Sequence, residues 1–133
     1  MNTIKKVNWI KGIPKPRASY SHLVRAGDYV FIAGQLGIDP ETGKVPKSIE
    51  EQMALIFEAI KKLLESEGGS FENVIKTTAF LSDTSYHEIY DEVYRSYFDK
   101  YPARSTVQAK LMHPECKIEI DAIAYIPKNE NKL

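Results

Sequence analysis

Two segments of the chain carry apolar residues at the three-and-four spacing of an amphipathic helix. The first opens with Ser48 and Glu51, which fit a capping box, and Gly68-Gly69 is expected to end it. Its apolar positions are Met53, Ile56, Phe57, Ile60, Leu63 and Leu64. The second opens with a similar pair, Ser85 and Glu88, and its apolar positions are Tyr86, Ile89, Tyr90, Val93, Tyr94, Tyr97 and Phe98. The spacing predicts two helices, each with one buried face.

Six further segments are rich in β-branched, aromatic and apolar residues and predict strands. Three precede the first predicted helix, one lies between the helices, and two follow the second. They cover residues 4–9, 21–25, 29–37, 74–81, 105–111 and 117–126. The resulting order, βββαβαββ, predicts a single α+β domain with a mixed sheet. Both helices then act as crossovers, and if they cover one face, the other face has no cover within the chain.

Alternation along the last two predicted strands separates apolar from polar side chains. The apolar sets, expected beneath the helices, are Val107, Ala109 and Leu111 in one strand and Ile118, Ile120, Ala122 and Ala124 in the other. The opposite face would then hold Arg104, Glu119 and Asp121. An arginine binds a carboxylate with its planar fork, and a glutamate can orient or deprotonate a water. The pattern fits equally a solvated face or a polar pocket closed by another copy.

Composition narrows the classes of function. The 133 residues are 43% hydrophobic, which suits one domain, residues 1–133, with a modest core. Eighteen basic and eighteen acidic residues give zero net charge, which argues against a general attraction to nucleic acid or anionic membranes. The sequence has no apolar run resembling a signal peptide or a membrane span. Its single cysteine, Cys116, excludes an intrachain disulfide and favours a cytoplasmic location.

The histidines and the cysteine give no sign of a metal site or a thiol nucleophile. His22, His87 and His113 are far apart and lack metal-ligand spacing, so each is expected to be a surface or loop residue. Cys116 has no adjacent His or Asp to activate it and is expected to be structural.

Two motifs give the chain a family resemblance. Residues 101–107, Tyr-Pro-Ala-Arg-Ser-Thr-Val, resemble the Pro-x-Arg-Ser-(Cys/Thr)-Val segment of the Rid family, the RidA (YjgF-type) enamine/imine deaminases. Residues 117–124, Lys-Ile-Glu-Ile-Asp-Ala-Ile-Ala, resemble the strand that follows it in that family. Weaker matches are residues 19–22, Ser-Tyr-Ser-His, and residues 33–35, Ala-Gly-Gln. The resemblance covers about residues 13–126, which is nearly the whole domain.

The resemblance implies a fold, an assembly and a reaction. The fold is chorismate-mutase-like, with two helices on one face of the sheet, and it assembles as a homotrimer with three clefts between subunits. The reaction is the hydrolysis of reactive enamines or imines, such as 2-aminoacrylate and 2-aminocrotonate, to 2-keto acids and ammonia. A 2-iminobutanoate/2-iminopropanoate deaminase of this type uses no cofactor.

By position, the resemblance also assigns the site. Arg104 would clamp the substrate carboxylate and Glu119 would hold or activate the attacking water, which makes these two the catalytic residues. Substrate-binding positions, in addition to Arg104, would be Tyr20, Ala33, Gly34, Asp91, Ser105 and Thr106. The last two would contribute through their backbone.

Three positions depart from the family pattern. Ala33 replaces a serine, Asp91 replaces an asparagine, and Ser19 replaces a proline before Tyr20. Asp91 is either a solvated helix residue or, if it reaches the cleft, a group that disfavours substrates with a second carboxylate.

Two other functions stay open. A non-catalytic trimer could use the Arg104 cleft to bind keto acids as a regulator, and Ala33 and Asp91 favour that alternative. Some members of the family carry ribonuclease or translation-inhibitor labels. Zero net charge counts against such a nucleic-acid function.

Overall fold

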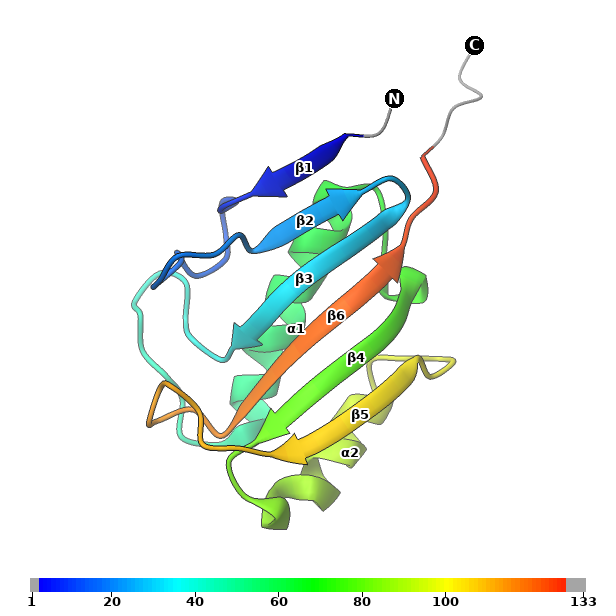
Figure 1. Cartoon of the computed structure of the whole chain (residues 1–133). Coiled ribbons are helices and arrows are strands. Elements are labelled where there is room, and N and C mark those ends of the chain that lie inside the picture. The colour runs from blue at the N-terminus through cyan, green and yellow to red at the C-terminus, as the bar shows by residue number, and fades with distance from the viewer. Residues whose placement is uncertain (1–2, 129–133) are drawn as a thin grey trace.

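The strands form one mixed sheet in the order β1-β2-β3-β6-β4-β5 (Figure 1). The computed structural model describes residues 3–128. Its strands are β1 Ile4–Val7, β2 Leu23–Ala26, β3 Tyr29–Leu36, β4 Val74–Leu81, β5 Ala103–Gln108 and β6 Ile118–Tyr125. Its helices are α1 Ile49–Ser66 and α2 His87–Arg95, with short 3₁₀ turns η1 Phe71–Asn73 and η2 Thr84–Tyr86. The predicted α+β class and the order βββαβαββ are confirmed.

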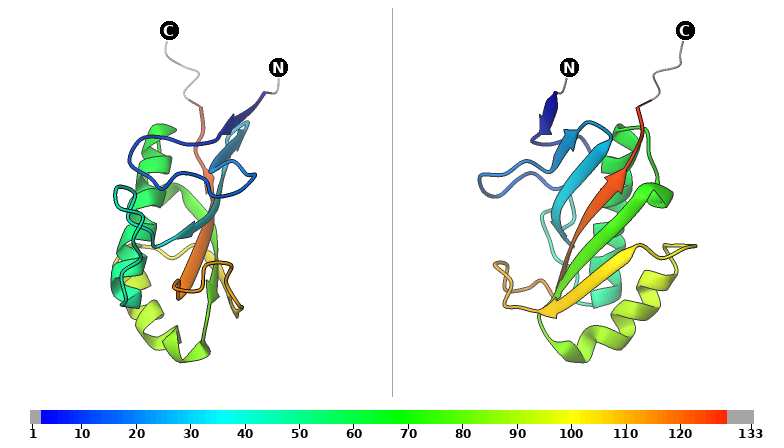
Figure 2. Two further views of the ribbon diagram at one scale, coloured as in Figure 1. Left: turned by 90° about the vertical axis from the view of Figure 1, so that its left-hand side faces the viewer. Right: turned by 45° about the vertical axis from the view of Figure 1, so that its right-hand side comes forward.

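Each α-helix connects two parallel strands and packs on the same face of the sheet. β4 and β5 pair in parallel, and α2 joins them. β3 and β4 both pair antiparallel to β6, which lies between them, and α1 makes the crossover. Both helices lie on one side of the sheet in the edge-on view (Figure 2). Within residues 3–128 the other face of the sheet is therefore left open.

Helix α1 begins and ends as the sequence predicts. Its first turn is capped by Ser48, whose hydroxyl oxygen accepts a hydrogen bond from the backbone N–H of Glu51. The C-terminal turn closes with the N–H of Gly69 donating to the carbonyl of Leu64, after Gly68 has taken a positive φ of 83°. The predicted apolar positions of this helix are all buried.

The second predicted helix differs from its expectation at both ends. The Ser85–Glu88 capping box is wrong, because Asp83 caps instead, its carboxylate accepting from the N–H of Ser85. A turn of 3₁₀ helix precedes α2, which ends at Arg95, before the last two apolar positions of the pattern. Those two, Tyr97 and Phe98, still pack on α1, where the Tyr97 ring stacks on Phe57 at 4.2 Å.

The buried amide of Gln52 on α1 holds the segment that leads into β6. Its Nε2 donates to the carbonyls of Pro46 and Glu115, and its Oε1 accepts from the backbone N–H of Lys117. Gln52 is fully buried, so these hydrogen bonds satisfy its amide out of contact with water. The chain therefore enters β6 from a fixed point at Lys117, two residues before Glu119.

The alternation expected in β6 is confirmed, but the one expected in β5 is inverted. Register places Arg104 beside Thr77 and Thr106 beside Ala79, and both β4 residues are buried beneath the helices. Val107 lies on the open face and is 47% exposed. Arg104 and Thr106 can lie under α2 because that helix presents tyrosine hydroxyls and aromatic rings to β5. The prediction that Arg104 shares a face with Glu119 and Asp121 is therefore wrong.

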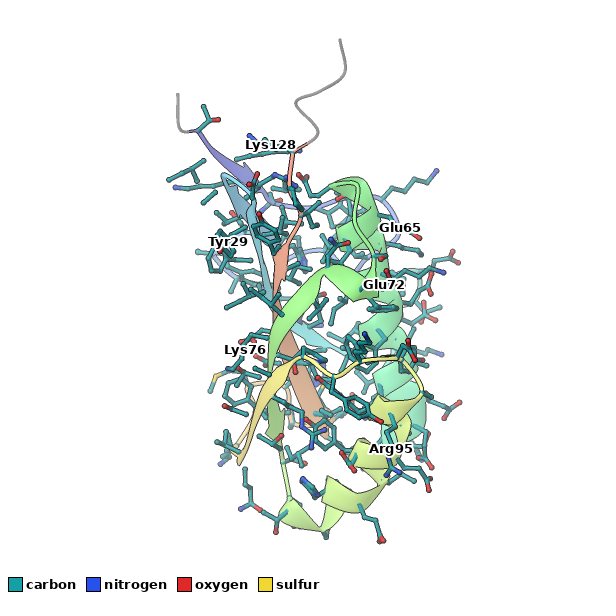
Figure 3. All side chains as sticks on the ribbon, turned by 90° about the vertical axis from the view of Figure 1, so that its right-hand side faces the viewer. Tyr29, Glu65, Glu72, Lys76, Arg95 and Lys128 are labelled. Atoms are coloured by element: carbon teal, nitrogen blue, oxygen red, sulfur yellow. The ribbon has the colours of Figure 1, made fainter. Side chains whose placement is uncertain are left out.

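The open face of the sheet mixes apolar and charged side chains. Figure 3 shows Tyr29 and Lys76 on the side of the sheet away from the helices. The large apolar side chains exposed on this face are Tyr29, Phe31, Val107 and Tyr125. None of the helices within residues 3–128 is long and apolar enough to cross a membrane.

Candidate active site

Arg104 lies on the edge strand β5 with its guanidinium held against α2. The guanidinium carbon is 4.8 Å from the centre of the Tyr90 ring and 4.7 Å from that of Tyr94. Its NH1 forms an ion pair of 3.0 Å with Oδ1 of Asp91. Aromatic faces attract cations, so the rings fix the plane of the guanidinium while the ion pair fixes one edge.

The two tyrosine rings are themselves anchored to the sheet. The hydroxyl of Tyr90 is 2.9 Å from Oγ1 of Thr106, and that of Tyr94 is 2.7 Å from Oγ1 of Thr77. Burial raises the pKa of both tyrosines. Both phenols therefore stay neutral near pH 7 and position Arg104 without adding a negative charge.

A cavity of about 250 Å³ opens beside the guanidinium. Its walls are Asp91, Tyr94, Arg95, Tyr101, Pro102 and Arg104. The Arg104 side chain is 24% exposed, so its free edge is accessible from the cavity. A guanidinium offers five N–H donors in one plane, and those left by the Asp91 contact suit a second carboxylate.

Asp91 reaches this cavity and is not a freely solvated helix residue. The Arg104 guanidinium beside it lowers the pKa of the Asp91 carboxyl, and Arg95 adds to the effect. Asp91 is therefore ionised near neutral pH. Where the Rid resemblance implies an asparagine, this chain has an anion in direct contact with Arg104.

Glu119 lies on the open face of β6 in a separate environment. Its carboxylate occupies the space over Gly34, where a side-chain Cβ would overlap the Glu119 carboxylate. Burial raises the pKa of Glu119, and the charge of Asp121 raises it further. Such a carboxyl is a better base than an ordinary surface glutamate, and perturbed acids of this kind concentrate at functional sites.

Contacts from the loop before β2 link Tyr20 through His22 to Ala33, which is next to Gly34 in the chain. The rings of Tyr20 and His22 meet edge to face at 5.3 Å, and the Ala33 N–H donates to the His22 carbonyl at 3.0 Å. His22 is 3% exposed, and its Nδ1 is 3.0 Å from Nε2 of the buried Gln35. His22 lies in the loop before β2, which is one of its two expected settings, but it is buried and not on the surface, and burial lowers its pKa and keeps it neutral.

The residues of the candidate site thus form two groups. The Arg104 group consists of Tyr90, Asp91, Tyr94, Arg104 and Thr106. The Glu119 group consists of Glu119 and Gly34, with Ala33 next to Gly34 in the chain and Tyr20 linked to Ala33 through His22. Arg104 and Glu119 lie on opposite faces of the sheet, and the strands β5 and β6 are separated by β4, which is about 10 Å at the usual strand spacing. One chain does not bring Arg104 and Glu119 together.

Ser105 belongs to neither group. Its register partner Thr78 pairs in turn with Asp121, which places the Ser105 side chain on the open face. Because β5 is an edge strand, its outer backbone groups have no strand partner within residues 3–128. The backbone of Ser105 and Thr106 therefore remains a candidate for hydrogen bonding to a ligand.

Sequence reasoning missed the part played by the tyrosines. It assigned Tyr90 and Tyr94 to the buried helix face alone, whereas their rings also hold Arg104. A signal was present, since two tyrosines four residues apart flank Asp91 on the helix that leads into the arginine motif.

Cys116 gives no competing site. Burial raises the pKa of its thiol to about 11, so the thiol stays protonated, as expected for a structural cysteine.

A larger cavity, of about 670 Å³, lies beside β1 and the end of α1. Its charged lining is engaged in ion pairs. Glu67 pairs with Lys5 at 2.8 Å and with the buried Arg25 at 3.4 Å. Arg25 also donates to the carbonyls of Gly27 and Ile126. These contacts tie β1, β2 and Ile126 to the end of α1, so the Arg104 cavity is the better candidate for ligand binding.

The close approach of Glu119 to Gly34 yields a first prediction. Gly34→Ala would push the Glu119 carboxylate from its place, so we expect the kcat of the imine hydrolysis that the resemblance implies to fall about 10- to 100-fold. Steady-state kinetics with a small imino acid would measure this kcat. In a Glu119→Gln background, Gly34→Ala should lower kcat little further. A further loss of kcat of about 10- to 100-fold in that background would show that Gly34 acts independently of Glu119.

The fold and the two groups define a small α+β domain with an arginine cavity at one sheet edge and a half-buried carboxylate on the opposite face. The chain belongs to the family described as Endoribonuclease L-PSP, whose model matches residues 11–126. This confirms the Rid resemblance.

Named relatives match over nearly the whole domain. A RutC family protein of Pyrococcus horikoshii is 41% identical over 92% of this chain and 98% of its own length. Reactive Intermediate Deaminase A of Arabidopsis thaliana is 36% identical over 90% of this chain and 65% of its own length. The crystal structure of Escherichia coli TdcF with bound serine superposes with a TM-score of 0.85 at 34% identity, covering 91% of this chain and 98% of TdcF. The family thus includes reactive intermediate deaminases.

Proposed function

We propose that this protein hydrolyses small carboxylate-bearing enamines and imines, such as 2-aminoacrylate and 2-aminocrotonate, to 2-keto acids and ammonia. One observation carries the proposal: the Arg104 guanidinium is fixed by two aromatic rings and faces a cavity with free donors. That arrangement suits a carboxylate anchor. A relative named as a reactive intermediate deaminase supports the reaction class.

The proposed site forms between subunits of a homotrimer. Arg104 and Glu119 lie on opposite faces of one chain, so a site that uses both takes the Arg104 group from one subunit and the Glu119 group from another. The exposed apolar side chains of the open face support such an assembly, because a face of this kind is usually covered. We place the trimer in the cytoplasm, where the single cysteine stays reduced.

The proposed reaction adds water across a C=N bond and expels ammonia. An enamine first takes a proton from solvent at its terminal carbon and becomes the iminium ion. Glu119 then accepts a proton from water as the water oxygen attacks the iminium carbon, which gives a tetrahedral amino alcohol. Glu119 returns this proton to the amine nitrogen, and the C–N bond breaks as the new hydroxyl group passes its own proton to Glu119. Ammonia and the 2-keto acid leave, and Glu119 releases the proton to solvent. Arg104 holds the carboxylate throughout, and its contribution is positional. The residues require no cofactor for these steps.

A second candidate is a trimer that binds keto acids or amino acids without turnover. The ion pair of Asp91 with Arg104 favours it, because the anchor is already partly neutralised. The bound serine of the TdcF structure shows that a relative holds a small amino acid. The family description also names a ribonuclease, but the zero net charge of this chain gives no general attraction to RNA.

One assay separates these functions. A dehydratase generates 2-aminoacrylate in the presence of the protein, and the rate of pyruvate formation is followed. We expect acceleration over the spontaneous rate, lost in Arg104→Ala. Carboxylate binding by calorimetry without acceleration would favour the regulator instead. RNA cleavage that survives Arg104→Ala, with neither of the other signals, would contradict both.

A further inference from the structure

The side chain of Asp91 is shared between two guanidinium groups. Its Oδ1 lies 3.0 Å from NH1 of Arg104, and its Oδ2 accepts a hydrogen bond of 3.2 Å from NH2 of Arg95. Arg95 is one helical turn further along α2, and Figure 3 shows it at that end of the helix. One edge of the Arg104 guanidinium is thus already occupied by an anion of its own chain.

We propose that Asp91 competes with the substrate carboxylate for Arg104, and that Arg95 receives Asp91 when the substrate binds. The inference rests on the proposed function, since it takes Arg104 as the carboxylate anchor. The two arginines and Asp91 carry a net charge of +1, which a bound carboxylate would neutralise.

The exposure of the three side chains differs in the way this exchange requires. Arg104 is held against two rings and is 24% exposed, whereas Asp91 and Arg95 are 38% and 55% exposed. Asp91 therefore moves more easily than Arg104. When Asp91 releases Arg104 it keeps its contact with Arg95, so its charge is never left without a partner. Without Arg95, releasing Arg104 would leave Asp91 with no cation, and binding would be weaker.

The competition also selects among substrates. At about 5 Å in a water-like dielectric, repulsion between two unit charges corresponds to roughly a fourfold loss of affinity. A second carboxylate on the ligand would add a further repulsion, whereas an iminium nitrogen near Asp91 would be attracted. Asp91 therefore favours small monocarboxylates that carry a neutral or cationic imine over dicarboxylates.

A double-mutant cycle tests the exchange, with pyruvate as the non-reacting probe in calorimetry and KM and kcat measured on 2-aminoacrylate. Asp91→Asn keeps an acceptor but removes the charge, so we expect pyruvate to bind about fourfold or more tightly and KM to fall with kcat unchanged. Arg95→Gln should weaken pyruvate binding in the wild-type background and have no effect in the Asp91→Asn background. Exposed residues of like charge, in Glu92→Gln and Lys100→Gln, serve as controls.

Three other outcomes would contradict the exchange, the competition or the proposed function, respectively. If Arg95→Gln weakens pyruvate binding equally in both backgrounds, Arg95 acts as a general surface cation and the exchange is wrong. If Asp91→Asn leaves binding unchanged or weaker, Asp91 is not a competitor, although Arg104 can still be the anchor. If pyruvate binding does not depend on Arg104 at all, the proposed function itself fails.

Discussion

Arg104→Ala is expected to lower kcat/KM for 2-aminoacrylate by about 10³-fold or more. The substitution removes a charge-assisted, two-point contact with the substrate carboxylate, and with it the alignment of the imine carbon toward water. Arg104→Lys should recover only a small part of the activity, because a lysine keeps the charge but loses the planar fork that lies against Tyr90 and Tyr94. Steady-state kinetics on both variants would measure these losses.

The same variants need a check on their assembly and folding. We expect Arg104→Ala to keep the oligomeric state of the wild type by light scattering, because Arg104 contacts its own α2. Lys100→Ala removes a positive charge from the exposed segment after α2 and should keep wild-type kinetics. Wild-type rates in Arg104→Ala would remove Arg104 from the mechanism.

Features of the fold that depend on local spacing were predictable from the sequence. The helix α1, its Ser48 cap and its glycine stop follow from residues adjacent in the chain. Strand β4 was predicted with the ends that the structure shows. The start of α2 was not, because Asp83 and Ser85 are both good caps and the choice depends on how the chain leaves β4.

The face of β5 could not be predicted from alternation. A period of two separates Arg104 from Val107 but does not say which of them points toward the helices. That choice depends on the partner surface: α2 offers Tyr90 and Tyr94, whose rings accept a guanidinium where an aliphatic helix face would exclude one. Alternation predicted that Arg104, Glu119 and Asp121 share one face. Packing against α2 instead places Arg104 on the helix side of the sheet and leaves the two carboxylates on the open face.

The family motifs indicated the two charged residues of the candidate site, Arg104 and Glu119. Arg104 lies at a cavity, and Glu119 has a raised pKa against Gly34. The ion pair between Asp91 and Arg104 could not be predicted from the sequence. Asp91 lies thirteen positions before Arg104, and the two meet only because the chain turns back between α2 and β5.

Glu119→Gln is expected to lower kcat by about 10²- to 10⁴-fold, the usual contribution of a general base. The substitution keeps the shape of the side chain over Gly34 and removes its ability to take a proton. The pH profile gives a second measure. In the wild type, kcat/KM should fall as the pH drops through the pKa of Glu119, which burial and Asp121 hold above its ordinary value. The variant should lose this acid limb.

Stability should change in the opposite sense to activity. Burial raises the pKa of Glu119 in the folded state, so its contribution to stability is present below the unfolded pKa and is lost as the pH rises through the folded pKa. At pH 7 the ionised side chain thus costs free energy, and Glu119→Gln should leave Tm unchanged or raise it. A glutamate kept at a cost to stability is a mark of function.

Asp121→Asn provides the matched control on the same face. Its side chain accepts a hydrogen bond from the Thr78 N–H, which an asparagine oxygen also accepts. We expect kcat to stay near the wild-type value. Because the charge of Asp121 raises the pKa of Glu119, the acid limb of kcat/KM should move to lower pH in this variant. An acid limb that persists unchanged in Glu119→Gln would assign the proton transfer to another group.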